Sequence, residues 1–228
     1  MTDEHAIRVL IVDDNRIFRR GVRLRLDNVD DVVVVGEAAT GTDAVTAALS
    51  ERPDVILMDL EMPGMNGIEA TRAVIEDSGG RVRVIALTSH GEDHLVRRAL
   101  SNGASGYLLK THDGAQLVEA IRSVHHGEGV VSSRVTRALL ADVVQRRIGD
   151  EDRGKVASLS PSEVAIIRLL SDGVTSNEHV AKRLGVSVNT VRTHIHAALR
   201  KVGVADRTQL ALWGVRVREE LVPRDGIR

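Results

Sequence analysis

The first half of the chain alternates short apolar runs with amphipathic stretches. The runs, several of them rich in valine or isoleucine, cover Ile7–Val12, Val32–Val35, Val55–Met58, Val82–Leu87 and Tyr107–Leu109. Short continuous runs of this kind are typical of strands that are buried on both faces of a sheet. The stretches between them place apolar residues at helical spacing, as in Phe18, Val22 and Leu26. Five strands that alternate with helices predict an α/β domain with a doubly wound, five-stranded parallel sheet.

The last third of the chain follows a helical pattern only. The tetrapeptide Ser160-Pro161-Ser162-Glu163 supplies an N-cap serine, a proline at the first helical position and a glutamate at the third, so it predicts a helix start with a capping box. Three more helices are predicted at about Glu178–Leu184, Ser187–Val202 and Arg207–Arg218. A glycine follows each of the first two of these, which favours a helix end there. The pattern predicts a small all-α domain.

These patterns divide the chain into two domains and a connection. The sheet domain closes near Gly127, which gives a first domain of residues 1–127, and the helical domain takes residues 158–220. Residues 128–157 are predicted to be a linker that contains a helix. Within it, Val131–Arg147 could be helical, with Val135, Leu139 and Val143 on one face, whereas Gly149–Gly154 is polar.

The composition limits the classes of protein and of site. The 228 residues include no cysteine, which excludes disulfides and thiolate metal sites and is compatible with a reducing cytoplasm. No apolar run approaches the ~18 residues needed to span a bilayer, and the N-terminus is acidic, which is wrong for a secretory signal. We therefore expect a cytoplasmic protein without a membrane partner.

The formal net charge of −1 hides an uneven charge distribution. Residues 1–77 hold 16 acidic residues against 8 lysines and arginines. Residues 179–205 hold no acidic residue, but they include Lys182, Arg183, Arg192, Arg200 and Lys201. One end of the chain therefore suits cations, and the other suits a polyanion such as nucleic acid.

Polar residues follow the predicted strands. Asp13 and Asp14 come after the first strand, Asp59 after the third, Thr88 after the fourth and Lys110 after the fifth. The carboxyl ends of parallel strands meet at one edge of the sheet, where clustered carboxylates need a cation such as Mg²⁺. Asp59 could act as a nucleophile that forms an acyl phosphate, with the hydroxyl and the ammonium binding phosphoryl oxygens. Each residue alone is more often a cap or a solvated group; the signal is the set.

Residues 1–127 resemble the receiver domain of response regulators, which has a flavodoxin/CheY-like fold. The matching text is Asp13-Asp14, the run from Met58 to Gly67, Thr88-Ser89, and Lys110 after Gly106-Tyr107-Leu108-Leu109. The resemblance implies that Asp59 is the phosphoacceptor.

The same resemblance implies the ligands of the site. Mg²⁺ would bind to Asp14, Asp59 and the backbone carbonyl of Glu61, with Asp13 assisting through water. Thr88 and Lys110 would hold the phosphoryl oxygens. Tyr107 occupies the family's aromatic switch position, although it could instead be a packing residue on the last strand.

The third predicted helix of the second domain has two unlike faces. Val191, Ile195 and Val202 can face a core, whereas Arg192, Thr193, His196 and Arg200 turn the other way. One helix fits the major groove of B-DNA, and side chains near its start reach base edges. Phosphate contacts are expected from Lys182, Arg183, Ser187, Thr190, Arg200 and Lys201. The alternative is a solvated polar face.

Leu159–Trp213 resembles the LuxR-type helix-turn-helix of the NarL/FixJ response regulators. The matching text includes Val180–Ser187, Thr190–Ile195 and Val202–Thr208. The resemblance implies base contacts by Arg192, Thr193 and His196, and a last helix that pairs the DNA-bound dimer. The segment Gly173–Ala181 is one residue longer than the family's spacing, which puts the cap of the second helix in doubt.

The leading hypothesis is a two-component response regulator. A sensor histidine kinase or a small phosphodonor phosphorylates Asp59, and dimerisation or release of the recognition helix then raises the affinity for promoter DNA. A second hypothesis is a phosphorylation-independent DNA-binding protein whose receiver only dimerises. A third is a haloacid-dehalogenase-type phosphatase, but those enzymes need an Asp-x-Asp motif and Glu61 stands at its second position. We expect no enzymatic activity beyond the receiver's own phosphorylation and dephosphorylation.

Overall fold

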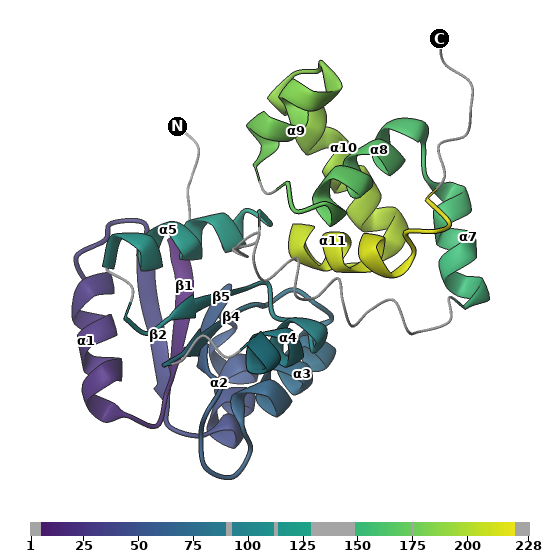
Figure 1. The fold of residues 1–228 in the computed structure, drawn as a ribbon. Coiled ribbons are helices and arrows are strands. Elements are labelled where there is room, and N and C mark those ends of the chain that lie inside the picture. Colours follow the sequence, from purple (N-terminus) through teal and green to yellow (C-terminus); the bar gives the residue numbers. More distant parts are fainter. Residues whose placement is uncertain (1–5, 90–92, 112–113, 129–148, 175, 222–228) are drawn as a thin grey trace. The chain divides into compact units, whose positions relative to one another are not determined.

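The chain consists of two compact units, each with its own hydrophobic core (Figure 1). The computed structural model describes residues 6–89, 93–111, 114–128, 149–174 and 176–221. The units divide the chain between residues 130 and 131. The helix expected at Val131–Arg147 lies outside the described residues. No helix in the described ranges is both long enough and apolar enough to cross a bilayer.

The first unit is built on a five-stranded parallel sheet, as the sequence predicts. The strands are β1 (Ile7–Val12), β2 (Val32–Ala38), β3 (Val55–Asp59), β4 (Arg83–Thr88) and β5 (Gly106–Leu109). Their spatial order is β2-β1-β3-β4-β5, and each pair of neighbours is parallel. The direction of winding therefore reverses between β1 and β3, and ligands of such sheets bind outside the carboxyl ends of the strands at this reversal.

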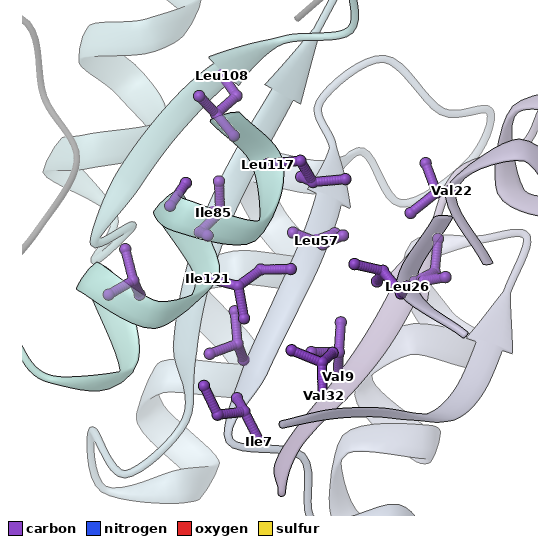
Figure 2. Close-up of a cluster of buried hydrophobic side chains, with 14 of the residues drawn as sticks. Ile7, Val9, Val22, Leu26, Val32, Leu57, Ile85, Leu108, Leu117 and Ile121 are labelled. Atoms are coloured by element: carbon purple, nitrogen blue, oxygen red, sulfur yellow. The ribbon is translucent and has the colours of Figure 1, made fainter. Parts of the chain in front are cut away.

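Helices cover both faces of this sheet. They are α1 (Arg16–Leu26), α2 (Gly41–Glu51), α3 (Gly67–Ser78), α4 (Asp93–Ser101) and α5 (Gly114–His125). Figure 2 shows the core under α1 and α5, where Val22 and Leu26 meet Ile121 and Leu57. A second core lies under α2 and α3. The two cores together keep β1, β3 and β4 almost completely buried.

The expectation that every strand is buried on both faces is wrong for the two edge strands, since Tyr107 and Leu109 of β5 are half-buried and β2 is more exposed still. Val33 is 41 % exposed, Glu37 is exposed, and Val34 and Val35 are half-buried. β2 stands at the edge of the sheet and pairs with β1 alone, so the layers above and below cover it less completely. A run of valines cannot distinguish an edge strand from a central one, because both need β-branched side chains.

The second unit is all-helical. Its described helices are α7 (Asp150–Ser158), α8 (Pro161–Ser171), α9 (Asn177–Leu184), α10 (Val188–Val202) and α11 (Arg207–Arg216). The predicted capping box is present, since the Glu163 N–H donates to Ser160 Oγ (3.3 Å) and the Ser160 N–H to Glu163 Oε2 (2.7 Å). The core combines residues of α8, α9, α10 and α11, with Trp213 and Ile167 among them.

The polar segment predicted to be linker at Gly149–Gly154 instead opens a helix. Gly149 is the N-cap of α7, and Asp150, Glu151 and Asp152 form its first turn. Acidic groups are favourable at a helix N-terminus because of the helix dipole. The acidic first turn can be recognised in the sequence, but the hydrogen bonds from α11 to Asp152 cannot.

Candidate functional site

Three carboxylates meet at the carboxyl edge of the sheet, where the winding reverses. Asp13 and Asp14 follow β1 directly, and Asp59 is the last residue of β3. One carboxylate oxygen from each lies within 4.8 Å of the other two. Asp13 and Asp59 are buried, whereas Asp14 is exposed. The structure thus brings together the three acidic residues that the strand ends predict, and leaves one of them open to solvent.

Lys110 reaches into this cluster from the end of β5. Its Nζ lies 2.7 Å from Asp13 Oδ2 and 2.8 Å from Asp59 Oδ2. The backbone N–H of Lys110 donates to the backbone oxygen of Thr88 (2.8 Å). Thr88 is the last residue of β4 and is completely buried. Tyr107 is half-buried on β5. All five residues of the predicted polar set therefore lie at one edge of the sheet.

The charges of the cluster work against one another. Burial raises the pKa of Asp59, and the charge of Asp13 adds to this, while the Lys110 ammonium and the Glu61 N–H (3.2 Å from Oδ1) oppose it. For Lys110, burial disfavours the charged form, but the hydrogen bonds to Asp13 and Asp59 outweigh burial and raise its pKa. The ammonium is thus held in its charged form between two carboxylates.

The donor set fits a hard divalent cation. Three carboxylates face a single ammonium, so the cluster keeps a net negative charge. Asp13 Oδ2 is buried, and beyond its ion pair with Lys110 it has no hydrogen-bonding partner. Carboxylate and carbonyl oxygens are the preferred ligands of Mg²⁺, which also retains water molecules that substrate phosphates can replace. Asp13, Asp14 and Asp59 could therefore hold a metal ion.

Neighbours of the carboxylate cluster include residues that the sequence did not place at this site. The Lys110 ammonium lies 5.1 Å from the centroid of the Phe18 ring, a cation–π contact that favours the charged side chain in this position. The Asn15 N–H donates to Asp13 Oδ1 (2.8 Å), and Arg19 Nη1 donates to the Asp13 backbone oxygen (2.6 Å). Phe18 was expected only in the core, because its helical spacing to Val22 carries no information about Lys110.

The second unit presents a basic helix, α10, with the two faces that the sequence predicts. Val191 and Ile195 are buried, whereas Arg192, Thr193 and His196 are exposed. The expected phosphate-binding residues Lys182, Arg183, Ser187 and Arg200 are also exposed, and Thr190 is half-buried. Ser187 caps α10, since its Oγ accepts from the Thr190 N–H (3.0 Å).

Two domain families match this chain. Residues 9–122 match the response regulator receiver domain, and residues 157–213 match the luxR family of bacterial regulatory proteins. The chain belongs to the NarL/FixJ family of two-component response regulators. It is therefore a response regulator that controls transcription, with a CheY-like receiver followed by a helical DNA-binding domain.

Similar proteins align with the response regulator over nearly its whole length. The transcriptional regulatory protein LiaR of Bacillus subtilis (strain 168) is 38 % identical over 210 residues, which are 92 % of this chain and 97 % of LiaR. The nitrate/nitrite response regulator protein NarL of Escherichia coli (strain K12) is 36 % identical, over 93 % of this chain and 97 % of NarL. A solved structure of two RcsB dimers bound to two parallel DNAs matches with a TM-score of 0.53 and 25 % identity, over 93 % of this chain and 100 % of that one.

Lys201 of the response regulator, which is expected to contact a DNA phosphate, is exposed and also pairs with a residue of α8. Its Nζ is 2.8 Å from Glu163 Oε2 and 3.0 Å from Oε1, and the Glu163 side chain is only 4 % exposed. Although burial opposes the charged form, hydrogen bonds from Lys201 and from the Ser160 N–H hold the pKa of Glu163 below its usual value. Lys201 thus joins α10 to the capping box of α8.

Lys201→Met is expected to lower the stability of the second unit, because it leaves the buried Glu163 carboxylate without its cation. We expect a loss of about 1–3 kcal/mol in the free energy of unfolding at neutral pH. The pKa of Glu163 is lowered on folding, so its contribution is present above the unfolded-state pKa and is lost as the pH falls through the folded-state pKa. Denaturant unfolding from neutral to acidic pH measures both effects.

Lys182→Met is the matched control for this substitution, because Lys182 is an exposed lysine on α9. It should leave the free energy of unfolding nearly unchanged. A Lys201→Met protein as stable as the Lys182→Met protein would show that the Glu163 ion pair contributes nothing.

The segment before α9, which is one residue longer than the family's spacing, is bound by Arg207. The sequence predicted Arg207 only as the start of the last helix. Ser176 caps α9, since its Oγ accepts from the His179 N–H (3.2 Å). Arg207 is only 5 % exposed; it donates to Asn177 Oδ1 (2.6 Å) and to the Val174 backbone oxygen (3.0 Å). The cap that was in doubt is therefore present, and Arg207 fixes both sides of the lengthened segment.

Proposed function

We propose that the response regulator is phosphorylated on Asp59 and that the phosphorylated form binds promoter DNA through α10. The observation that carries the proposal is the contact of the Lys110 ammonium with both Asp13 and Asp59 inside a cluster of three carboxylates. This arrangement supports an aspartate nucleophile with a cationic partner for the incoming phosphoryl group.

The residues divide the work of phosphoryl transfer. A carboxylate oxygen of Asp59 attacks phosphorus, the bond to the donor's leaving atom breaks, and an acyl phosphate forms. Lys110 then exchanges Asp59 for a phosphoryl oxygen, and Thr88 donates its hydroxyl to another. Mg²⁺, held by Asp14, Asp59 and the Glu61 carbonyl with Asp13 assisting, would neutralise charge on the phosphoryl oxygens. In the phosphorylated state Thr88 moves toward the phosphoryl group and Tyr107 turns inward behind it.

The partners follow from the family and from the charge of the two sites. The phosphodonor is a sensor histidine kinase, or a small molecule such as acetyl phosphate, and the receiver turns over no external substrate. The phosphorylated protein forms a homodimer on double-stranded DNA in the cytoplasm. The relative RcsB, solved as dimers bound to DNA, supports this mode of binding.

The DNA contacts come from one helix and its surroundings. Arg192, Thr193 and His196 contact bases in the major groove, because they are exposed on α10 opposite its buried face. Phosphate contacts come from Lys182, Arg183, Ser187, Thr190 and Arg200. Lys201 is exposed as well, and its phosphate contact would compete with its ion pair to Glu163.

The experiment that tests the proposal is a footprint across genomic DNA fragments with and without acetyl phosphate and Mg²⁺. The expected result is a protected site whose half-saturation falls at lower protein concentration when phosphodonor is present. Equal protection with and without phosphodonor would favour a phosphorylation-independent DNA-binding protein. No protected site in either condition would remove the DNA-binding half of the proposal.

Arg192→Ala is expected to cost about 1–3 kcal/mol in specific DNA binding and to relax the preference at one base position, because an arginine can contact guanine in a bidentate manner. Arg183→Ala is the matched control: as a phosphate contact it should weaken binding to all sequences alike and reduce the salt dependence. Titrations against the footprinted site and against variants of it measure both. If the two substitutions weaken specific and nonspecific binding equally, Arg192 does not contact a base.

A further inference from the structure

Helix α7 is the first described element of the second unit, and it is weak by its own sequence. It has nine residues, no fully buried side chain and a glycine, Gly154, in its interior. Isolated helices shorter than about 12 residues are marginal in water, and an interior glycine costs about 1 kcal/mol relative to alanine. The helix therefore depends on contacts with the rest of the unit.

The main polar contact of α7 is Asp152 against α11. Asp152 Oδ1 accepts from Trp213 Nε1 (2.9 Å) and from Arg216 Nη2 (2.9 Å). The Asp152 side chain is 15 % exposed and Trp213 only 5 %, so the bond between them is shielded from water, whereas the Arg216 side chain is 39 % exposed. The ion pair of Arg153 with Glu220 (3.4 Å) is exposed and contributes little.

Apolar packing does not replace this polar contact along the rest of the helix. A cleft of about 720 Å³ lies between α7 and α8, lined by Val156 and Ala157 on one side and by Val164, Ala165 and Leu169 on the other. Val156 packs against the core of the second unit and α7 also contacts α10, but Val156 is only half-buried, so α7 has fewer core contacts than α8 and α11. Asp152 thus supplies the least exposed polar attachment of a marginal helix.

We propose that α7 is a detachable latch, held on α11 by Asp152 and released when the receiver is phosphorylated. The proposal rests on the proposed function of Asp59. Among the described helices of the second unit, α7 is the one nearest to the receiver in the sequence, so it is the first candidate for a change that the receiver causes. A helix whose attachment is worth only a few kcal/mol can shift between docked and released populations. Release uncovers the side of α11 that carries Trp213 and Arg216.

Trp213 is the only tryptophan in the chain, so its fluorescence reports on one place, the core of the second unit where Asp152 of α7 meets α11. In the unphosphorylated full-length protein, Asp152→Ala is expected to raise the quenching of Trp213 by acrylamide. It should also speed hydrogen exchange of the α7 amides about ten- to hundredfold, as expected for a lost hydrogen bond to a charged group.

Two further variants isolate the latch. Asp150→Ala removes the same charge from the same turn, but the Asp150 side chain is 99 % exposed and contacts only Arg153, so both readouts should stay near wild type. Gly154→Ala adds a methyl group with no neighbour within 4 Å, and about 1 kcal/mol of helix propensity should slow α7 exchange about fivefold. Equal effects of Asp152→Ala and Asp150→Ala would overturn the latch.

The coupling to the receiver is tested with acetyl phosphate and Mg²⁺, with intact mass confirming that phosphate is bound. Phosphorylated wild type should approach the Trp213 quenching and α7 exchange of Asp152→Ala, whereas Asp59→Asn should not respond. Bound phosphate with an unchanged α7 overturns the latch and leaves the proposed function standing. Absence of bound phosphate overturns both.

Discussion

Asp59→Asn is expected to abolish incorporation of phosphate from acetyl phosphate, and with it any gain in DNA affinity from the phosphodonor. The amide nitrogen and oxygen of asparagine are too weakly nucleophilic to form the acyl phosphate. The side chain keeps its size, and one oxygen can still accept from the Glu61 N–H or from Lys110. The loss therefore reports chemistry rather than packing, and intact mass measurement with and without phosphodonor detects it.

Asp77→Asn is the control for this experiment. Asp77 is an exposed aspartate on α3 of the same domain, so its substitution removes the same charge away from the carboxylate cluster. Asp77→Asn should incorporate phosphate like wild type, and both variants should unfold near the wild-type temperature. Phosphate on Asp59→Asn would identify a different acceptor and would refute the assignment of Asp59.

Gly67→Ala is expected to cause the largest loss of stability among single methyl additions to the receiver, about 3 kcal/mol or more in the free energy of unfolding. A Cβ at this position would overlap the backbone oxygen of Asp59 and lie 2.7 Å from the Asp59 carbonyl carbon and 2.9 Å from Leu60 Cα. All three are backbone atoms of β3 and its continuation, so no side chain can move aside. Because the overlap is with Asp59 itself, phosphorylation should also slow. Denaturant unfolding measures the first effect, and the time course of phosphate incorporation measures the second.

Gly21→Ala supplies the matched comparison. Gly21 lies inside α1, and a Cβ there would have no neighbour within 4 Å. The same substitution should therefore stabilise the receiver by about 0.5–1 kcal/mol, since alanine favours the helix and restricts the unfolded chain. Gly67→Ala with the stability of Gly21→Ala would mean that the close approach of α3 to β3 is not a constraint.

The contrast between these two glycines illustrates what the hydrophobic pattern can predict. The five strands, the four helices from α8 to α11 and the capping box of Ser160 and Glu163 follow from local preference, so they could be predicted from spacing. The order of the strands could not, because pairing depends on contacts between distant segments. Whether a glycine can be replaced depends on the atoms that an added Cβ would meet. At Gly67 the nearest of these is the backbone oxygen of Asp59, eight residues earlier in the chain.

The candidate site was predictable to the extent that strand ends determine it. Asp13, Asp14, Asp59, Thr88 and Lys110 each follow a strand, and parallel strands place their carboxyl ends together. The Phe18 ring beside Lys110 and the Arg207 bonds to Val174 and Asn177 were not predictable, because helical spacing gives the direction of a side chain but not its partner.

The sequence by itself determined the two-domain division into a sheet and a helical unit, the clustering of carboxylates at one sheet edge and the two faces of α10, because periodicity and strand ends are local properties. Only the tertiary structure decided the edge position of β2, the ion pair of Lys201 with Glu163, and the docking of α7 through Asp152. Each of these features depends on contacts with a segment that is distant in the sequence. The sequence shows a lysine on α10 and a glutamate in a capping box, but only the fold brings Lys201 Nζ to within 2.8 Å of the buried Glu163 carboxylate.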